Sequence, residues 1–225
     1  MCPECNYHFR IGAQERLTFL VDPGSHQELS GDIEPSDPLR EALPARLQRC
    51  EDLLQLDRRL TAIRKGDAQP KDAAEQIALA ELCQRYKKHY ADAARFYADA
   101  FAAKPALTPV QQALVRYNAA CAATLAAAGK GEDAARLDAK DKARLHQQAL
   151  SWLQETIKVY EELLQDADAK TRDGLQKTLR HWQKDADLAS VRDKEVLAKL
   201  PAAERPAWQQ LWADVAKLLK KASAE

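Results

Sequence analysis

The sequence contains few residues that interrupt helices and few that favour strands. Only 7 of its 225 residues are glycine and 6% are aromatic, whereas alanine occurs throughout. This composition favours helices over strands. Hydrophobic residues make up 46% and charged residues 30% of the chain, as in an ordinary folded domain. We therefore predict an all-α fold.

The sequence also lacks a net charge, a long apolar run and a dense set of cysteines. Lysine plus arginine and aspartate plus glutamate number 34 each, so no overall charge attracts nucleic acid or anionic lipid. No apolar run approaches the roughly 20 residues that span a bilayer, and the chain begins without a secretory apolar segment. The five cysteines, an odd number, predict reduced thiols. We expect a cytoplasmic protein that binds neither nucleic acid nor membrane.

The chain changes character near residue 40. Residues 1–40 begin with a Cys-x-x-Cys pair, and prolines and glycines predict a loop over residues 22–40. Pro44 is the last breaker, and from Arg46 onward apolar residues recur at three- and four-residue steps, which predicts amphipathic helices. We expect a short, loop-rich and poorly ordered leader over 1–40 and a helical domain over 41–225.

Caps and breakers divide the second part into successive predicted helices. The first has a broad apolar face and ends at Gly66. Asp72 is a candidate cap for a second helix through about Arg85, and Tyr90 opens a third. Further helices are expected over about 141–164, around Trp182 and over 201–221.

A capping box marks the start of a helix after the third one. Thr108-Pro109-Val110-Gln111 places a cap, a proline at the first helical position and a reciprocal glutamine in the required order. The helix that follows carries Leu114 and Tyr117 among its apolar residues and ends at Gly129.

Small residues recur where two antiparallel helices would cross. Two sets have the spacing of tetratricopeptide repeats: Ala93, Tyr97, Ala100 and Pro105, and, across an insertion at Lys130–Lys140, Tyr117, Ala120, Cys121, Ala149 and Leu153. A methyl side chain lets two helices approach closely. The helix that precedes the first set matches the repeat less well and contains one extra residue before Tyr90. The spacing predicts tetratricopeptide-like antiparallel hairpins, with a generic helical bundle as the alternative.

Several longer strings strengthen this interpretation: Arg49–Leu54, Ala78–Cys83, Arg116–Ala123, His181–Gln183 and Trp208–Val215. With them, residues 46–221 resemble the tetratricopeptide-like tail of planctomycete serine/threonine protein kinases. The resemblance implies a module that binds partners or regulates. The kinase's glycine-rich loop, His-Arg-Asp loop and Asp-Phe-Gly motif are missing from the sequence. We expect a non-enzymatic interaction scaffold with a protein or peptide partner and no catalytic residues.

Cys2 and Cys5 form half of a zinc knuckle. Tetrahedral zinc requires four ligands, commonly two such pairs, and no second pair follows; His8 and His26 do not lie at a familiar zinc spacing. The two cysteines are therefore candidate zinc ligands of an incomplete site, or else a pair of exposed, oxidisable thiols. No other cofactor is expected.

Four stretches around this pair match a known enzyme subunit: Cys2–Ile11, Glu15–Leu17, Asp22–Ser25 and Asp37–Leu39. Residues 2–39 resemble the start of the β subunit of bacterial acetyl-CoA carboxylase carboxyltransferase, whose ribbon has a further cysteine pair. The catalytic body of that family does not follow Leu39. The resemblance implies an alternative function: a zinc-binding fragment or fusion of that subunit, associated with fatty-acid synthesis.

The remaining reactive residues suggest structural roles. Cys50, Cys83 and Cys121 lie on apolar helix faces and are expected to be buried small hydrophobes. The histidines His89, His146 and His181 have no evident carboxylate partner, so no triad is predicted. Trp182, Trp208 and Trp212 are expected to close the C-terminal core, with an aromatic peptide-binding groove as the functional alternative.

Overall fold

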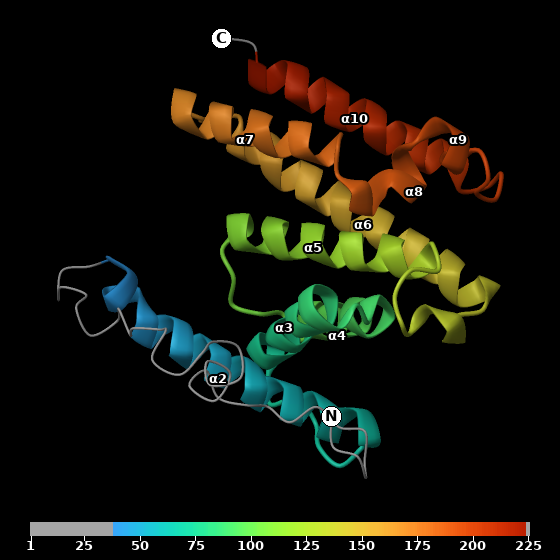
Figure 1. The fold of residues 1–225 in the computed structure, drawn as a ribbon. Helices are drawn as coiled ribbons and strands as arrows, with labels where there is room; N and C mark the ends of the chain where they lie inside the picture. Colours follow the sequence, from blue (N-terminus) through green and yellow to red (C-terminus); the bar gives the residue numbers. More distant parts are fainter. Residues whose placement is uncertain (1–37, 224–225) are drawn as a thin grey trace, which may run out of the picture. The chain divides into compact units, whose positions relative to one another are not determined.

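The computed structural model describes the backbone of residues 38–223 and the side chains of residues 44–223 (Figure 1). These residues are mostly helical and contain no strand, which confirms the all-α prediction. The chain divides into two compact units, Met1–Asp52 and Leu53–Glu225. Of the first unit, the described part, residues 38–52, is helical, and every helix from α3 onward lies in the second unit.

Helix α2 (Pro38–Lys65) begins earlier than expected, and Pro44 lies inside it. The loop prediction was therefore wrong for residues 38–40. A proline inside a helix removes one backbone hydrogen bond without necessarily ending the helix. The predicted end is confirmed: Gly66 has φ +85°, its N–H donates to Ile63 O at 3.1 Å, and the next N–H donates to Ala62 O at 3.0 Å.

The apolar face of α2 is buried only toward its C-terminal end. Leu60 is 2% exposed, whereas Leu47 and Leu54 are 62% and 43% exposed. Cys50 is also exposed, so its predicted burial was wrong. A periodic apolar pattern shows which side of a helix is apolar, but not which turns of that side are covered.

Helix α3 (Ala73–Leu82) begins at the predicted cap, because the Asp72 side chain accepts a hydrogen bond from Glu75 N at 2.8 Å. The α-helix does not continue to Arg85: a π-helical turn, η2 (Cys83–Lys87), follows Leu82. A π turn holds more residues than an α turn. The repeat-like spacing predicts an extra residue before Tyr90, and the π turn lies in this part of the chain.

Helices α4 (Tyr90–Ala102) and α5 (Pro109–Ala127) start where they were predicted. Both halves of the capping box at Thr108 are present, with Gln111 N donating to Thr108 Oγ1 at 3.3 Å and Thr108 N donating to Gln111 Oε1 at 2.9 Å. Helix α5 ends before Gly129, which has φ +77°. Leu114 was expected on the apolar side but is 59% exposed.

Helix α6 (Ala139–Leu163) packs on α5, α5 packs on α4, and α4 packs on α3 (Figure 1). Alanines lie at these contacts: Ala93, Ala100, Ala120 and Ala149 are all 0% exposed. The alanines are thus buried, as helices that approach closely at small side chains require. Larger side chains such as Phe96 and Tyr97 fill the space beside them and are at most 1% exposed.

The insertion between α5 and α6 is held against the start of α4. It contains one turn of 3₁₀ helix, η3 (Ala134–Arg136). Glu132 N donates to Lys88 O at 3.1 Å, and the buried Asp133 carboxylate accepts from Asp92 N at 2.8 Å. Asp133 thereby caps α4, whose own N-cap residue provides no side-chain cap.

The C-terminal part consists of α7 (Ala169–Trp182), the 3₁₀ turn η4 (Ala186–Leu188), α8 (Ala189–Arg192), α9 (Lys194–Leu197) and α10 (Arg205–Ser223). Helix α10 packs on α7 and α6 (Figure 1). Trp182 and Trp208 are buried, as predicted. Trp212 is half-buried, and its indole N–H donates to Val191 O at 2.8 Å.

Across the portion of the chain that the structure describes, no helix combines the length and apolar character needed to cross a bilayer.

Candidate functional site

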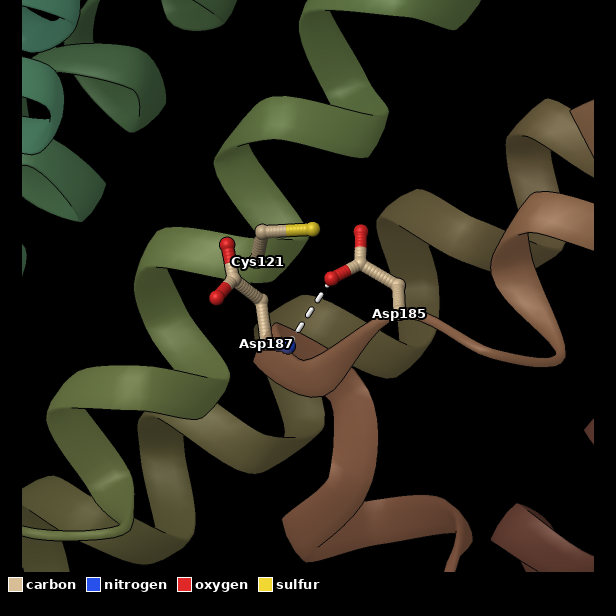
Figure 2. Close-up of side chains that lie close together, drawn as sticks. All are labelled: Cys121, Asp185 and Asp187. Carbon is tan, nitrogen blue, oxygen red and sulfur yellow. Dashed lines mark hydrogen bonds between the residues drawn. The ribbon is translucent and has the colours of Figure 1, made fainter.

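A cysteine and two aspartates lie together between α5 and the segment after α7 (Figure 2). Cys121 belongs to α5, and Asp185 and Asp187 lie at the start of η4. The sulfur and one carboxylate oxygen from each aspartate all lie within 4.8 Å of one another. In Figure 2 the sulfur of Cys121 points toward the Asp185 carboxylate, and the Asp187 carboxylate lies beside the cysteine side chain.

Local hydrogen bonds position the two aspartates. Asp185 caps η4, since its Oδ1 accepts from Asp187 N at 2.9 Å. Thr124 Oγ1 on α5 donates to Asp187 O at 3.0 Å, which fixes the turn against the helix. The Tyr117 hydroxyl donates to Asp185 Oδ2, and His181 Nε2 lies 3.2 Å from the same oxygen.

The cluster concentrates negative charge in partly buried surroundings. Burial, reinforced by the Asp185 and Asp187 carboxylates, raises the pKa of the Cys121 thiol well above its ordinary value. Burial and then the Asp185 charge raise the pKa of Asp187. Among the residues that the structure describes, no lysine or arginine side chain forms an ion pair with either aspartate.

Neither buried thiol has the character of a nucleophile. Burial raises the pKa of Cys83 to about 12, and that of Cys121 is also raised. A reactive cysteine needs a lowered pKa, because the thiolate is the attacking form. The predicted burial of both residues is confirmed at 0% and 2% exposure.

A second feature is a cleft of about 980 Å³ between the first half of α6 and the start of α10. Its apolar lining comes from both sides: Ala143, Leu150, Ala203, Ala207 and Trp208. Its polar lining carries both signs of charge: Asp138, Lys140, Asp141, Arg144, His146, Gln147 and Glu204. The volume is close to the upper end of the roughly 300–1,000 Å³ typical of ligand sites.

The His146 side chain lines this cleft from α6 and is 9% exposed. Its Nδ1 lies 3.0 Å from Glu204 Oε2, and its ring meets Trp208 edge-on at 6.5 Å between centroids. Its Nε2 is buried and has no hydrogen-bond partner among the described residues. A buried polar atom without a partner is rare in a folded protein, which makes this histidine a candidate contact for a ligand.

The histidines were expected to lack carboxylate partners, and this expectation was wrong. His89 Nε2 lies 3.3 Å from Glu132 Oε2, and His146 pairs with Glu204. These carboxylates are 43 and 58 residues distant in the chain, so only the fold brings them together. The His181–Asp185 pair, in contrast, has the i,i+4 spacing of a helical contact and was recognisable from the sequence.

The predicted zinc ligands Cys2 and Cys5 lie outside the described residues. Asp185, Asp187 and Glu204 were missed as site residues, because each sits in a connection whose folded path the periodicity of the helices does not specify.

No protein-family model matches this chain, and no solved structure matches it. The case for a function therefore depends on the fold and on the two features described above.

Proposed function

We propose that residues 41–225 form a tetratricopeptide-like array of antiparallel helix hairpins that binds a segment of a protein partner and catalyses no reaction. Three pairs of packed helices support the proposal: α3 with α4, α5 with α6, and α7 with α10. Fully buried alanines such as Ala93 and Ala149 lie within these pairs. Stacked hairpins of this kind leave a continuous surface that suits an extended or helical partner segment.

The cleft between α6 and α10 is the observation that carries the proposal. Its lining combines apolar residues such as Leu150 and Ala207 with charged residues of both signs such as Lys140 and Asp141. Protein-binding surfaces combine an apolar core with polar residues around it. A partner side chain in the cleft would pack on Leu150 and Ala207, which are both half-buried.

We place this activity in the cytoplasm, as an accessory or regulatory scaffold. Cys50, Cys83 and Cys121 are free cysteines in the described part of the chain. Unpaired thiols fit a reducing compartment.

Filling the cleft tests this proposal. Ala143 is an exposed alanine of α6 in the cleft, and Ala213 is an exposed alanine of α10 that does not line it. The full chain carrying Ala143→Trp should lose a partner captured from the source cell, identified by quantitative mass spectrometry, while Ala213→Trp retains it. Equal recovery with both variants would exclude the cleft as the binding surface. Loss with both would point to a general effect of the added indole.

A further inference from the structure

We propose a zinc site between α5 and the segment that follows α7, with four ligands: Cys121, His181, Asp185 and Asp187. The site is independent of the proposed partner-binding function, and of the Cys2 and Cys5 pair. Its role is structural: it would connect the middle of α5 to the turn that leads into α8.

The arrangement of the donor atoms supports such a site. The cysteine sulfur and one oxygen of each aspartate lie within 4.8 Å of one another, close enough for one ion to contact all three after small side-chain rotations. His181 Nε2 lies 3.2 Å from Asp185 Oδ2, and its side chain is 62% exposed, so the ring is free to turn toward the cluster. Tetrahedral zinc takes four ligands from cysteine, histidine and carboxylate side chains.

The donor set selects among metals. Calcium and magnesium prefer oxygen ligands in larger coordination numbers. A sulfur and an imidazole nitrogen favour zinc over these ions. Because the site offers one sulfur, one nitrogen and two oxygens, we assign it to Zn²⁺.

The negative charge of the cluster favours the binding of a cation. Two aspartates lie beside a buried thiol, and neither carboxylate forms an ion pair with a lysine or arginine in the described residues. A divalent cation would stabilise the two carboxylates and the thiolate together.

The buried thiol is an independent indication of a ligand. Cys121 is 2% exposed, and its sulfur points toward the Asp185 carboxylate in Figure 2, where the adjacent Tyr117 hydroxyl donates to Asp185 Oδ2. On zinc binding the thiol would lose its proton to solvent as the sulfur–metal bond forms.

The hydrogen bonds to the Asp185 carboxylate would hold it in position as a metal ligand. Its two oxygens already accept from Asp187 N and from the Tyr117 hydroxyl. A carboxylate has about four lone-pair positions, so these bonds leave room for a metal. Such outer hydrogen bonds hold metal ligands in orientation and tune their affinity.

Cobalt titration of the full chain tests the proposal. Cys2→Ser and Cys5→Ser are introduced first, so that a knuckle at the N-terminus cannot contribute. The protein is stripped with EDTA, desalted and titrated with Co²⁺. We expect a sulfur-to-cobalt charge-transfer band and the visible bands of a tetrahedral ion, saturating at one ion per chain and abolished by displacement with Zn²⁺.

Two variants and a control assign the band to this site. Cys121→Ser should abolish the charge-transfer band, while Cys83→Ser, which changes the other buried thiol, should leave it intact. Asp187→Asn, at a half-buried position, should keep the helical circular dichroism and bind Co²⁺ at least about tenfold more weakly. A missing band in the Cys2→Ser/Cys5→Ser chain, or a band that survives Cys121→Ser, would overturn the assignment.

Discussion

At single positions, we expect the small alanine side chain to allow two helices of this protein to approach closely. Ala149 on α6 is 0% exposed, and Ala143 on the same helix is exposed. Ala149→Leu should lower the free energy of unfolding by about 1–3 kcal/mol, because the added atoms overpack the contact. Ala143→Leu, the matched control, should change it by less than about 0.5 kcal/mol. Urea unfolding followed by circular dichroism measures both, and equal effects would argue against close packing at Ala149.

Two glycines give a second contrast at the residue scale. Gly131 has φ +93°, and a Cβ there would lie 2.5 Å from Lys88 O, whereas a Cβ at Gly174 in α7 would meet nothing within 4 Å. Gly131→Ala should destabilise the chain by more than about 1 kcal/mol. Gly174→Ala should stabilise it by about 0.5–1 kcal/mol, because alanine favours the helix. Thermal unfolding of the two variants should therefore shift in opposite directions.

Asp187 gives a prediction that depends on pH. Its pKa is raised by burial and by Asp185, so the folded chain binds a proton more tightly than the unfolded chain. Proton binding by Asp187 therefore stabilises the folded chain below the unfolded-state pKa, about 3.9. This stabilisation is lost as the pH rises through the folded-state pKa. In EDTA, Asp187→Asn should therefore be more stable than the natural chain at pH 7, with the gain shrinking toward pH 4.

The control for the Asp187 prediction is the same stability measurement with zinc present. With saturating Zn²⁺, the natural chain should gain stability that the Asp187→Asn chain lacks, since a ligand stabilises the state that binds it. A variant that is less stable than the natural chain at pH 7 in EDTA would show that Asp187 is stabilising without metal.

At the scale of elements, the sequence predicted where several helices begin and end, but not the π turn that follows α3. The helix ends at Gly66 and Gly129 and the starts at Asp72 and Thr108 were predicted correctly, because each depends on a side chain or a backbone angle within a few residues. The π turn at Cys83–Lys87 was not predicted as such. Whether an extra residue lengthens a loop or widens a helical turn depends on packing from outside the helix.

The capping box at Thr108 makes a prediction for α5. Thr108→Ala removes the side-chain acceptor of Gln111 N and should lower stability by about 1 kcal/mol. Thr61→Ala, at an exposed threonine inside α2, serves as the control and should be neutral or slightly stabilising. Similar losses from both substitutions in urea unfolding would indicate that the box contributes little beyond any surface threonine.

At the scale of the whole molecule, helical periodicity predicted the class of the fold but not the sites. The buried alanines and the tryptophans Trp182 and Trp208 lie where the periodicity indicated. The cleft residue Glu204 and the aspartates Asp185 and Asp187 lie outside the long helices or at their edges. Their positions depend on how the segment between α7 and α10 folds back over α5, a long-range arrangement without a local signal.

The central claim is that this helical array binds a partner in the cleft between α6 and α10. Hydrogen–deuterium exchange of the full chain, with and without the captured partner, tests it most directly. We predict slower exchange in the partner complex at residues 139–150 and 201–208, with little change on α3. Unchanged exchange in both of these segments, together with slower exchange elsewhere on the chain, would contradict it.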